Sequence, residues 1–210
     1  MECTSFCRGH IDESISLSES AKPLEKALIN ALSQCVQEAH IVSEVEFGSW
    51  DDAYATAMRQ VNVDFPDNQD VIALFVESMM ARTPWNMWDV KTCLPPKGVD
   101  TYEAISVCEY AIELADQHDK KQHPAILHLH IHLIEMSTEP ENAIESANRL
   151  VGLCPDAGYI HHMPGHIYIL CEEYEKAKIA SEAAIRVNLK YLSYAGPGSV
   201  ANKGHSIQCS

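Results

Sequence analysis

The sequence predicts an all-α protein, arranged as a right-handed α-solenoid of helical hairpins. Apolar residues recur three and four positions apart through most of the 210 residues. No segment shows the alternating pattern of a strand or an Asn-Gly hairpin turn. Similar helical segments also recur at a fixed interval near the C-terminal end. Apolar side chains make up 46% of the chain, enough to bury a sizeable core.

Residues 8–83 are expected to form N-terminal helical hairpins. Pro23 suits the first turn of one helix, and Ser49 can cap the next, which follows Gly48. Pro66 and Pro84 stop helices, because proline disfavours helical backbone in the residue before it. The expected helices span 23–36, 49–65 and 68–82.

Residues 84–98 are rich in proline and are expected to connect the two parts of one continuous solenoid. Trp85 and Trp88 in this connector should pack onto neighbouring helices. Residues 99–192 should form tetratricopeptide-like (TPR-like) repeats, and the Gly- and Ser-rich residues 193–210 a flexible tail. The expected helices of the repeats span 100–117, 123–137, 140–154, 157–173 and 174–192.

The repeat period is visible in two similar segments, "ENAIESANRL" and "EKAKIASEAA". Ala143 and Ala177 occupy matching positions 34 residues apart, which is the TPR period. Ala147 and Ser181 also place small residues where TPR helices approach closely. Such hairpins need their neighbours to bury their apolar faces, which favours a solenoid.

Histidine follows the same period. His128 and His132 are four positions apart, so they share one face of a helix, and His162 and His166 repeat this spacing. Each residue of the first pair lies 34 residues before its counterpart in the second. Since the first helices of adjacent TPRs lie side by side, the two pairs should face each other. Glu135 shares the face of the first pair.

These five residues are predicted to bind a transition metal. Imidazole nitrogens with one carboxylate suit Zn, Cu or Fe better than Mg or Ca, which prefer oxygen. The expected ligands are His128, His132, Glu135, His162 and His166, with Glu135 also a candidate catalytic base. The competing interpretation is a concave polar groove whose paired histidines bind a peptide or nothing.

Several neighbouring residues have less certain roles in this hypothesis. Pro164, between the second pair, should kink the helix or mark its beginning. Tyr168 could line the groove edge, and Tyr159 or Met163 could pack behind the histidines, with Glu172 as a weak carboxylate partner. The remaining histidines of this region fit solvated or hydrogen-bonded roles: His118, His123, His130 and His161.

The net charge of −15 argues against nucleic acid and against anionic membrane surfaces as partners. No apolar run reaches the length of a membrane span, and the first residues lack the apolar region of a signal peptide. The eight cysteines contain no C-x-x-C pair and are interpreted as mostly reduced. These features favour a cytoplasmic protein whose partner is another protein or a small molecule.

The segments "PLEKALINAL", "AYATAM", "PWNMWD", "HPAILHLHIHLIE", "HHMPGHIYI" and "YEKAKIASEAAI" together resemble a TPR-like family with H-P-G-x-x-H-x-x-x-H-x-x-E and H-M-P-x-H-I motifs. The resemblance covers residues 8–192 and implies a helical array with a His-rich inner face. The matching positions are His123, His128, His132, Glu135, His162 and His166, whereas Ala125 replaces the expected Gly. The family is expected to carry helices before "MECTSFC" and a further His-bearing helix after residue 192, so this chain is expected to be a shortened member.

Three functions remain open. The first is a metalloprotein on a TPR-like scaffold, possibly a metal-dependent enzyme. The second is a protein–protein interaction scaffold whose groove favours basic partners, although it lacks the Lys and Arg clamp of peptide-tail-binding TPRs. The least favoured is nucleophilic catalysis by Cys171, since nothing in its sequence surroundings indicates a lowered thiol pKa.

Overall fold

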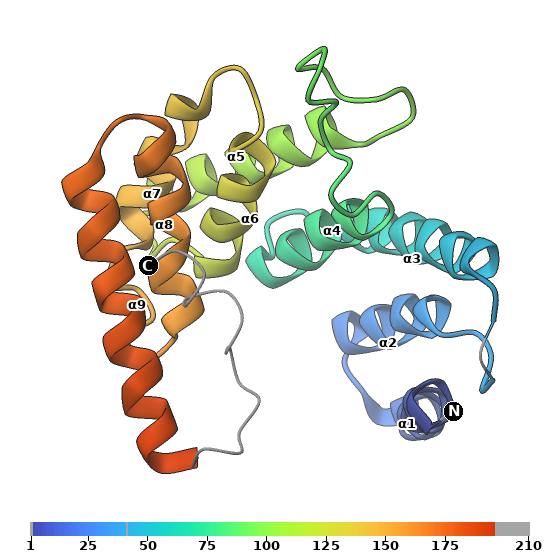
Figure 1. The fold of residues 1–210 in the computed structure, drawn as a ribbon. Coiled ribbons are helices and arrows are strands. Elements are labelled where there is room, and N and C mark those ends of the chain that lie inside the picture. Colours follow the sequence, from blue (N-terminus) through green and yellow to red (C-terminus); the bar gives the residue numbers. More distant parts are fainter. Residues whose placement is uncertain (1, 41, 196–210) are drawn as a thin grey trace. The chain divides into compact units, whose positions relative to one another are not determined.

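The computed structural model describes residues 2–40 and 42–195, and the secondary structure of this part is helical apart from one isolated β-bridge between Asp89 and Leu94 (Figure 1). This confirms the predicted all-α class. Among these residues, no helix has both the length and the apolarity to cross a membrane. The helices are α1 (Glu2–Leu17), η1 (Ser18–Ser20), α2 (Pro23–Cys35), α3 (Glu44–Asp64), α4 (Gln69–Ala81), α5 (Thr101–Gln117), α6 (Pro124–Ile134), η2 (Pro140–Ala143), α7 (Ile144–Leu150), α8 (Gly158–Leu170) and α9 (Tyr174–Ala195).

The chain divides into two compact units. Unit 1 contains residues 1–87 and 97–104, and unit 2 contains residues 88–96 and 105–210. The division falls within the predicted connector and within α5. The end of the predicted tail, residues 196–210, lies outside the described residues, whereas residues 193–195 extend α9.

Unit 1 begins with a helix that the sequence did not predict. Helix α1 spans Glu2–Leu17, and Ile11 is the residue it buries at 6% exposure. Most of its described side chains are exposed, and no helix is predicted there from the sequence. Helix α2 packs between α1 and α3, and its first turn begins at Pro23 as predicted.

Helix α3 starts five residues earlier than predicted. Its cap is Ser43 rather than Ser49: the Ser43 hydroxyl accepts a hydrogen bond from the backbone N–H of Glu46 at 3.3 Å. The Glu46 carboxylate in turn accepts from the backbone N–H of Ser43 at 2.9 Å. This reciprocal capping box satisfies two N–H groups that a helix start leaves unpaired. Gly48 therefore lies inside α3, where its cost in helix propensity is tolerated.

The core of unit 1 comes mainly from α3 and α4, which pack against each other. Asn68 caps α4 by accepting a hydrogen bond from the backbone N–H of Val71 at 3.1 Å. Thr83 and Pro84 follow its end, as predicted. The apolar side chains that these two helices bury are Trp50, Ala55, Met58, Val61, Val71, Ile72, Ala73, Phe75, Val76 and Met79.

Unit 2 is organised around one apolar core shared by α6, α7, α8 and α9. Ala143, Ala147 and Ala177, the small residues of the repeat, are all buried. They allow close approach of the helices, and larger apolar side chains fill the space between them. The core also contains Leu127, Ile131, Ile134, Leu150, Met163, Ile167 and Tyr168.

The helix predicted over residues 140–154 is the shortest α-helix described in unit 2. Residues Pro140–Ala143 form a 3-10 turn, and the α-helix proper covers only Ile144–Leu150. Gly152 follows with a φ of 82°, which ends the helix because glycine adopts this backbone region without steric cost. The other predicted helices of both units agree with the structure within three residues at each end.

The two connector tryptophans have opposite environments. Trp88 is buried as predicted, and its indole Nε1–H donates to the backbone carbonyl of Leu133 at 2.7 Å. That carbonyl lies in the last turn of α6, where helical acceptors lack partners in their own helix. Trp85 is 84% exposed, so the prediction that it packs onto a helix was wrong. The φ of Trp85 is 62°, in the left-handed backbone region that bulky residues rarely adopt.

Replacing Trp88 by phenylalanine should lower the free energy of unfolding by about 1–3 kcal/mol. The substitution removes the indole donor and leaves the buried carbonyl of Leu133 unpaired. Urea denaturation measures the change, and Trp85→Phe is the matched control, expected to change stability by less than about 0.5 kcal/mol. Equal losses in the two variants would contradict the assigned role of the indole.

Candidate functional site

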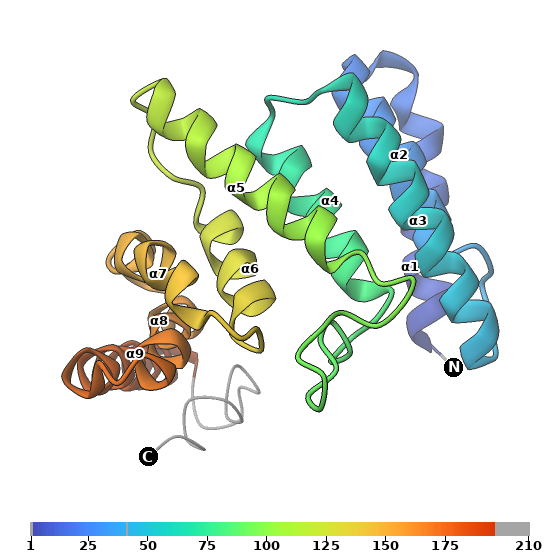
Figure 2. The same ribbon diagram turned by 90° about the horizontal axis from the view of Figure 1, so that it is seen from above.

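The structure brings together the two histidine pairs that the sequence separates by one repeat. Helix α6 carries His128 and His132, and α8 carries His162 and His166. These helices pack against each other within unit 2 (Figures 1 and 2). The ring centroids of His132 and His166 are 6.2 Å apart, and those within each pair are 4.8 Å apart. The 34-residue offset therefore corresponds to spatial proximity.

Glu135 joins the two helices. It caps the C-terminal end of α6, and its two carboxylate oxygens each contact a different imidazole. One oxygen lies 2.8 Å from Nδ1 of His132, and the other lies 2.6 Å from Nδ1 of His166. One carboxylate thus orients a histidine from each of the two pairs.

Hydrogen bonds extend the arrangement at both ends. Nε2 of His132 lies 3.1 Å from the Tyr159 hydroxyl, at the start of α8. Nε2 of His166 lies 3.0 Å from Nε2 of His162, which is only 5% exposed. Five side chains form one continuous chain of hydrogen bonds, which we call the His–Glu cluster: Tyr159, His132, Glu135, His166 and His162.

The charge of Glu135 determines the tautomers in the His–Glu cluster. Burial alone would raise the pKa of this carboxyl, but hydrogen bonds from His132 and His166 outweigh it and lower the pKa to about 2. Because the carboxylate is ionised near neutral pH, Nδ1 of both imidazoles must donate to it. In their neutral forms both rings then present Nε2 as an acceptor. The Tyr159 hydroxyl donates to His132, and Nε2–H of His162 donates to His166.

The phenol of Tyr159 is suited to remain a donor. Burial, followed by the charge of Glu135, raises its pKa above the ordinary value. The sequence offered Tyr159 only as a residue packed behind the histidines. The structure adds a direct hydrogen bond, which sequence spacing could not indicate because it depends on the rotamer of a residue at the start of α8.

His128 packs against the cluster through its ring. The ring centroids of His128 and Tyr159 are 5.2 Å apart, with the rings nearly perpendicular. Burial, followed by the nearby imidazole of His132, lowers the pKa of His128 to about 4, so the ring is neutral at pH 7. Its Nε2 atom is buried and has no hydrogen-bond partner among the described residues. A neutral imidazole with an unused buried nitrogen is a potential ligand.

Pro164 does not mark the start of a helix, as one predicted alternative had it. Helix α8 begins at Gly158 and includes Pro164 together with both histidines of the second pair. His162 and His166 therefore remain on one face, one turn apart. Helix α9 packs against α8 near Gly165. A Cβ added at Gly165 would make an ordinary van der Waals contact, 3.9 Å from the backbone oxygen of Ala177.

As they stand, no three His, Cys, Asp or Glu side chains within the described ranges are placed to hold a metal ion together. Two nitrogens of the cluster do approach closely, since Nε2 of His162 and Nε2 of His166 are 3.0 Å apart. Two nitrogens bound to one zinc-like ion at about 2.0–2.1 Å are separated by roughly 3 Å. The donor types fit a transition metal, whereas both oxygens of Glu135, a predicted ligand or base, already accept hydrogen bonds.

A pocket of about 380 Å³ lies next to the cluster in unit 2. Its polar wall contains Glu135, His162, His166 and Ser181. The rest of its lining is apolar, and three of these side chains are substantially exposed: Met136, Ile169 and Leu170. Ser181 was predicted only as a small residue of helix packing, and its place in the pocket lining was not predicted.

Other residues considered for the site have different roles. The Tyr168 hydroxyl donates to Asn148 at 3.0 Å, and Met163 belongs to the apolar core. Glu172 is exposed beyond the end of α8 with a φ of 61°. His123 is the N-cap residue of α6, and His161 lies 3.2 Å from the carbonyl oxygen of Pro155.

His130 forms a second, separate polar contact. It is 4% exposed, and its Nδ1 atom lies 2.9 Å from the Ser146 hydroxyl, which is also buried. The sequence placed His130 away from the metal site and allowed a hydrogen-bonded role, which this contact fits. Burial lowers its pKa to about 4, so the ring is neutral at pH 7.

Comparison of the chain with models of protein families, with curated proteins and with solved structures gave no match in any of the three cases. The residues of the site therefore carry the evidence for function.

Proposed function

We propose that this chain is a TPR-like helical-repeat protein that binds a divalent transition metal ion at the His–Glu cluster. The observation that carries the proposal is the position of Glu135, whose two oxygens accept hydrogen bonds from Nδ1 of His132 and His166. A carboxylate bonded to the far nitrogen of an imidazole is the usual support of a metal-binding histidine. It fixes the tautomer and leaves Nε2 available to a metal.

The repeat arrangement supports a solenoid. Equivalent histidines 34 residues apart lie on adjacent helices, and the small residues of the repeat are buried. A TPR-like array brings the same position of successive repeats together on one surface. The cluster then belongs to the concave face of the repeats in unit 2.

His162 and His166 are the primary ligands in this proposal. Their Nε2 atoms are 3.0 Å apart. Metal binding requires His162 to shift its proton from Nε2 to Nδ1, which breaks the hydrogen bond between the two rings and leaves both Nε2 lone pairs for the ion. His128, whose ring is neutral at pH 7, and His132 are the additional donors on the neighbouring helix. Glu135 acts as a positioning residue. We infer Zn, Cu or Fe rather than Mg or Ca, because the donors are imidazole nitrogens.

The pocket beside the cluster suits a small molecule that approaches the metal. A metal ion bound here would polarise a substrate group or activate a water. The chain itself supplies an apolar wall from Met136, Ile169 and Leu170 and a hydroxyl from Ser181. We propose catalysis on such a molecule as the first form of this site and a metal-binding scaffold without catalysis as the second.

Isothermal titration calorimetry with Zn²⁺ and Cu²⁺ on the chelator-treated, tag-free chain tests the proposal. We expect one ion per chain, with binding that weakens as the pH falls because protons compete for the imidazoles. His166→Ala and His162→Ala should each weaken binding at least about tenfold. His118→Ala is the matched control, since His118 is exposed and outside the cluster.

Absence of binding by the wild-type chain would overturn the proposal. The same holds if His166→Ala, His162→Ala and His118→Ala retain wild-type affinity while circular dichroism shows intact helices.

A further inference from the structure

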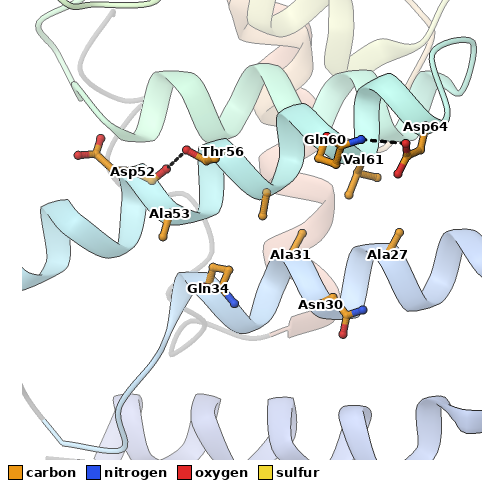
Figure 3. A pocket seen from close by; sticks show the side chains of 11 residues that line it. Ala27, Asn30, Ala31, Gln34, Asp52, Ala53, Thr56, Gln60, Val61 and Asp64 are labelled. Carbon is orange, nitrogen blue, oxygen red and sulfur yellow. Dashed lines mark hydrogen bonds between the residues drawn. The ribbon is translucent and has the colours of Figure 1, made fainter.

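Unit 1 contains an open groove far along the sequence from the His–Glu cluster. It has a volume of about 690 Å³ and lies between α2 and α3 (Figure 3). Its lining follows one stripe of each helix: Ala27, Asn30, Ala31 and Gln34 are spaced by three or four residues on α2. Such spacing places these residues on one face of α2, although Ala31 on that face is buried.

The floor of the groove is built from small residues. Ala27 and Ala31 come from α2, and Ala53 and Ala57 come from α3. Each pair is four residues apart, so the small side chains succeed one another by one helical turn. Ala31 is buried, whereas Ala27, Ala53 and Ala57 are partly exposed and form the part of the floor that a third helix can contact closely.

Carboxylates lie at the two ends of the groove, and the charge of the one at Asp52 is partly neutralised by Arg82. Asp52 and Asp64 lie at opposite ends of the lined stretch of α3, twelve positions apart (Figure 3). At 1.5 Å per residue this corresponds to about 18 Å along the helix. Asp52 also bonds to Arg82 at 2.7 Å, whereas Asp64 accepts from the Gln60 side chain at 2.9 Å. Within the described part of the chain, no Lys or Arg lines the groove.

Three of the usual ways to bind a peptide do not fit this groove. The backbone groups of α2 and α3 are paired inside their helices, so a strand cannot add by main-chain hydrogen bonds. The lining contains no aromatic residue for a polyproline segment and no arginine for a phosphorylated one. An amphipathic helix laid into the groove remains, held by its small residues and by charge.

We propose that this groove binds a basic amphipathic α-helix of a partner protein. The helix lies between α2 and α3, with small residues against the alanine floor and a Lys or Arg near each of Asp52 and Asp64. Asn30, Gln34 and Gln60 supply hydrogen bonds along its edges. A second copy of this chain is a poorer occupant, because each copy has a net charge of −15.

Fluorescence anisotropy with a labelled peptide tests the proposal on the full chain. The probe is a helical peptide of about 16 residues, rich in Ala and Leu, with two Lys twelve positions apart. One control peptide carries Glu at these two positions. A second carries the two Lys six positions apart, which spans a similar distance only in an extended chain. We expect the twelve-spaced Lys peptide to bind best and its affinity to fall with added salt.

Variants of the chain locate the binding. Asp64→Lys should weaken the Lys peptide about fivefold by reversing one charge contact. Ala57→Leu should weaken it at least as much by filling the floor of the groove. The controls are Glu182→Lys, which changes the net charge equally on exposed α9, and Ala39→Leu, which lies outside the groove. Both controls should bind as the wild type does.

Three results would overturn the proposal. They are equal binding of the Lys and Glu peptides, preference for the six-spaced peptide, and wild-type affinity in both Asp64→Lys and Ala57→Leu. A concentration-dependent dimer that Ala57→Leu abolishes would assign the groove to a second copy instead. None of these results bears on metal binding by the His–Glu cluster.

Discussion

Lowering the pH from about 7 to about 4 should lower the free energy of unfolding of the metal-free chain by about 3 kcal/mol through His130. The folded chain buries this imidazole, which lowers its pKa from 6.5 to about 4. In the unfolded chain the same group takes up a proton near pH 6.5. Between these two values the unfolded state binds more protons, so stability falls as the pH falls. Below about 4 both states are protonated and the loss from this group is complete.

His128 should add to the loss over the same interval, because its folded pKa is also about 4. Glu135 acts later: its pKa of about 2 lies below the ordinary value of 4.5, so its stabilisation is lost only as the pH falls from about 4.5 to 2. The two histidines therefore act in the weakly acidic range, and Glu135 acts in the strongly acidic range.

Urea denaturation at several pH values, with His130→Asn as the variant, measures the contribution of His130. The asparagine amide can replace Nδ1 in the contact with Ser146 but has no proton to gain in this range. The variant should be less stable than the wild type near pH 7 and should lose about 3 kcal/mol less on acidification. His118→Asn, an exposed control, should keep the wild-type pH dependence. An identical pH dependence in His130→Asn would contradict the prediction.

The sequence predicted the position of the histidines better than their bonding. The 34-residue period predicted their proximity, and the two pairs lie on the neighbouring helices α6 and α8. Their bonding depends on side-chain rotamers. Glu135 was predicted to be a ligand or a base. In the structure, each of its two carboxylate oxygens accepts a hydrogen bond from an imidazole. Tyr159 was expected to pack behind the site, whereas its hydroxyl bonds to His132.

The fold shows the same limit. Trp85 and Trp88 are identical residues in one Pro-rich segment, and only the local backbone decides that Trp88 reaches Leu133 while Trp85 stays exposed. Periodicity predicted most helices, because burial of one face is a property of the pattern. It failed for α1, which buries little, and for the start of α3, where Ser43 and Ser49 are both suitable caps. Choice between equivalent local signals requires tertiary contacts that a single sequence does not contain.

Glu135→Gln should weaken transition-metal binding by about 10–100-fold, the range known for residues that orient metal-binding histidines. A carboxylate and a glutamine side chain differ in the number of hydrogen bonds that they can accept. A carboxylate accepts from Nδ1 of both His132 and His166, but a glutamine offers one acceptor oxygen and one donor NH₂. One of the two imidazoles must then accept at Nδ1 and carry its proton on Nε2. That ring loses the lone pair that the metal needs.

Nitrogen NMR shifts of the two rings in the metal-free chain report this change directly, apart from any effect on affinity. In the wild type both His132 and His166 should be Nδ1–H tautomers at neutral pH, and in Glu135→Gln one of them should become the Nε2–H tautomer. Glu141→Gln, an exposed neighbour with the same change of charge, should preserve both the tautomers and the metal affinity. Unchanged tautomers together with unchanged affinity in Glu135→Gln would show that the carboxylate does not position the histidines. A tautomer change without loss of affinity would instead confine the metal to His128 and His162, the two imidazoles that Glu135 does not contact.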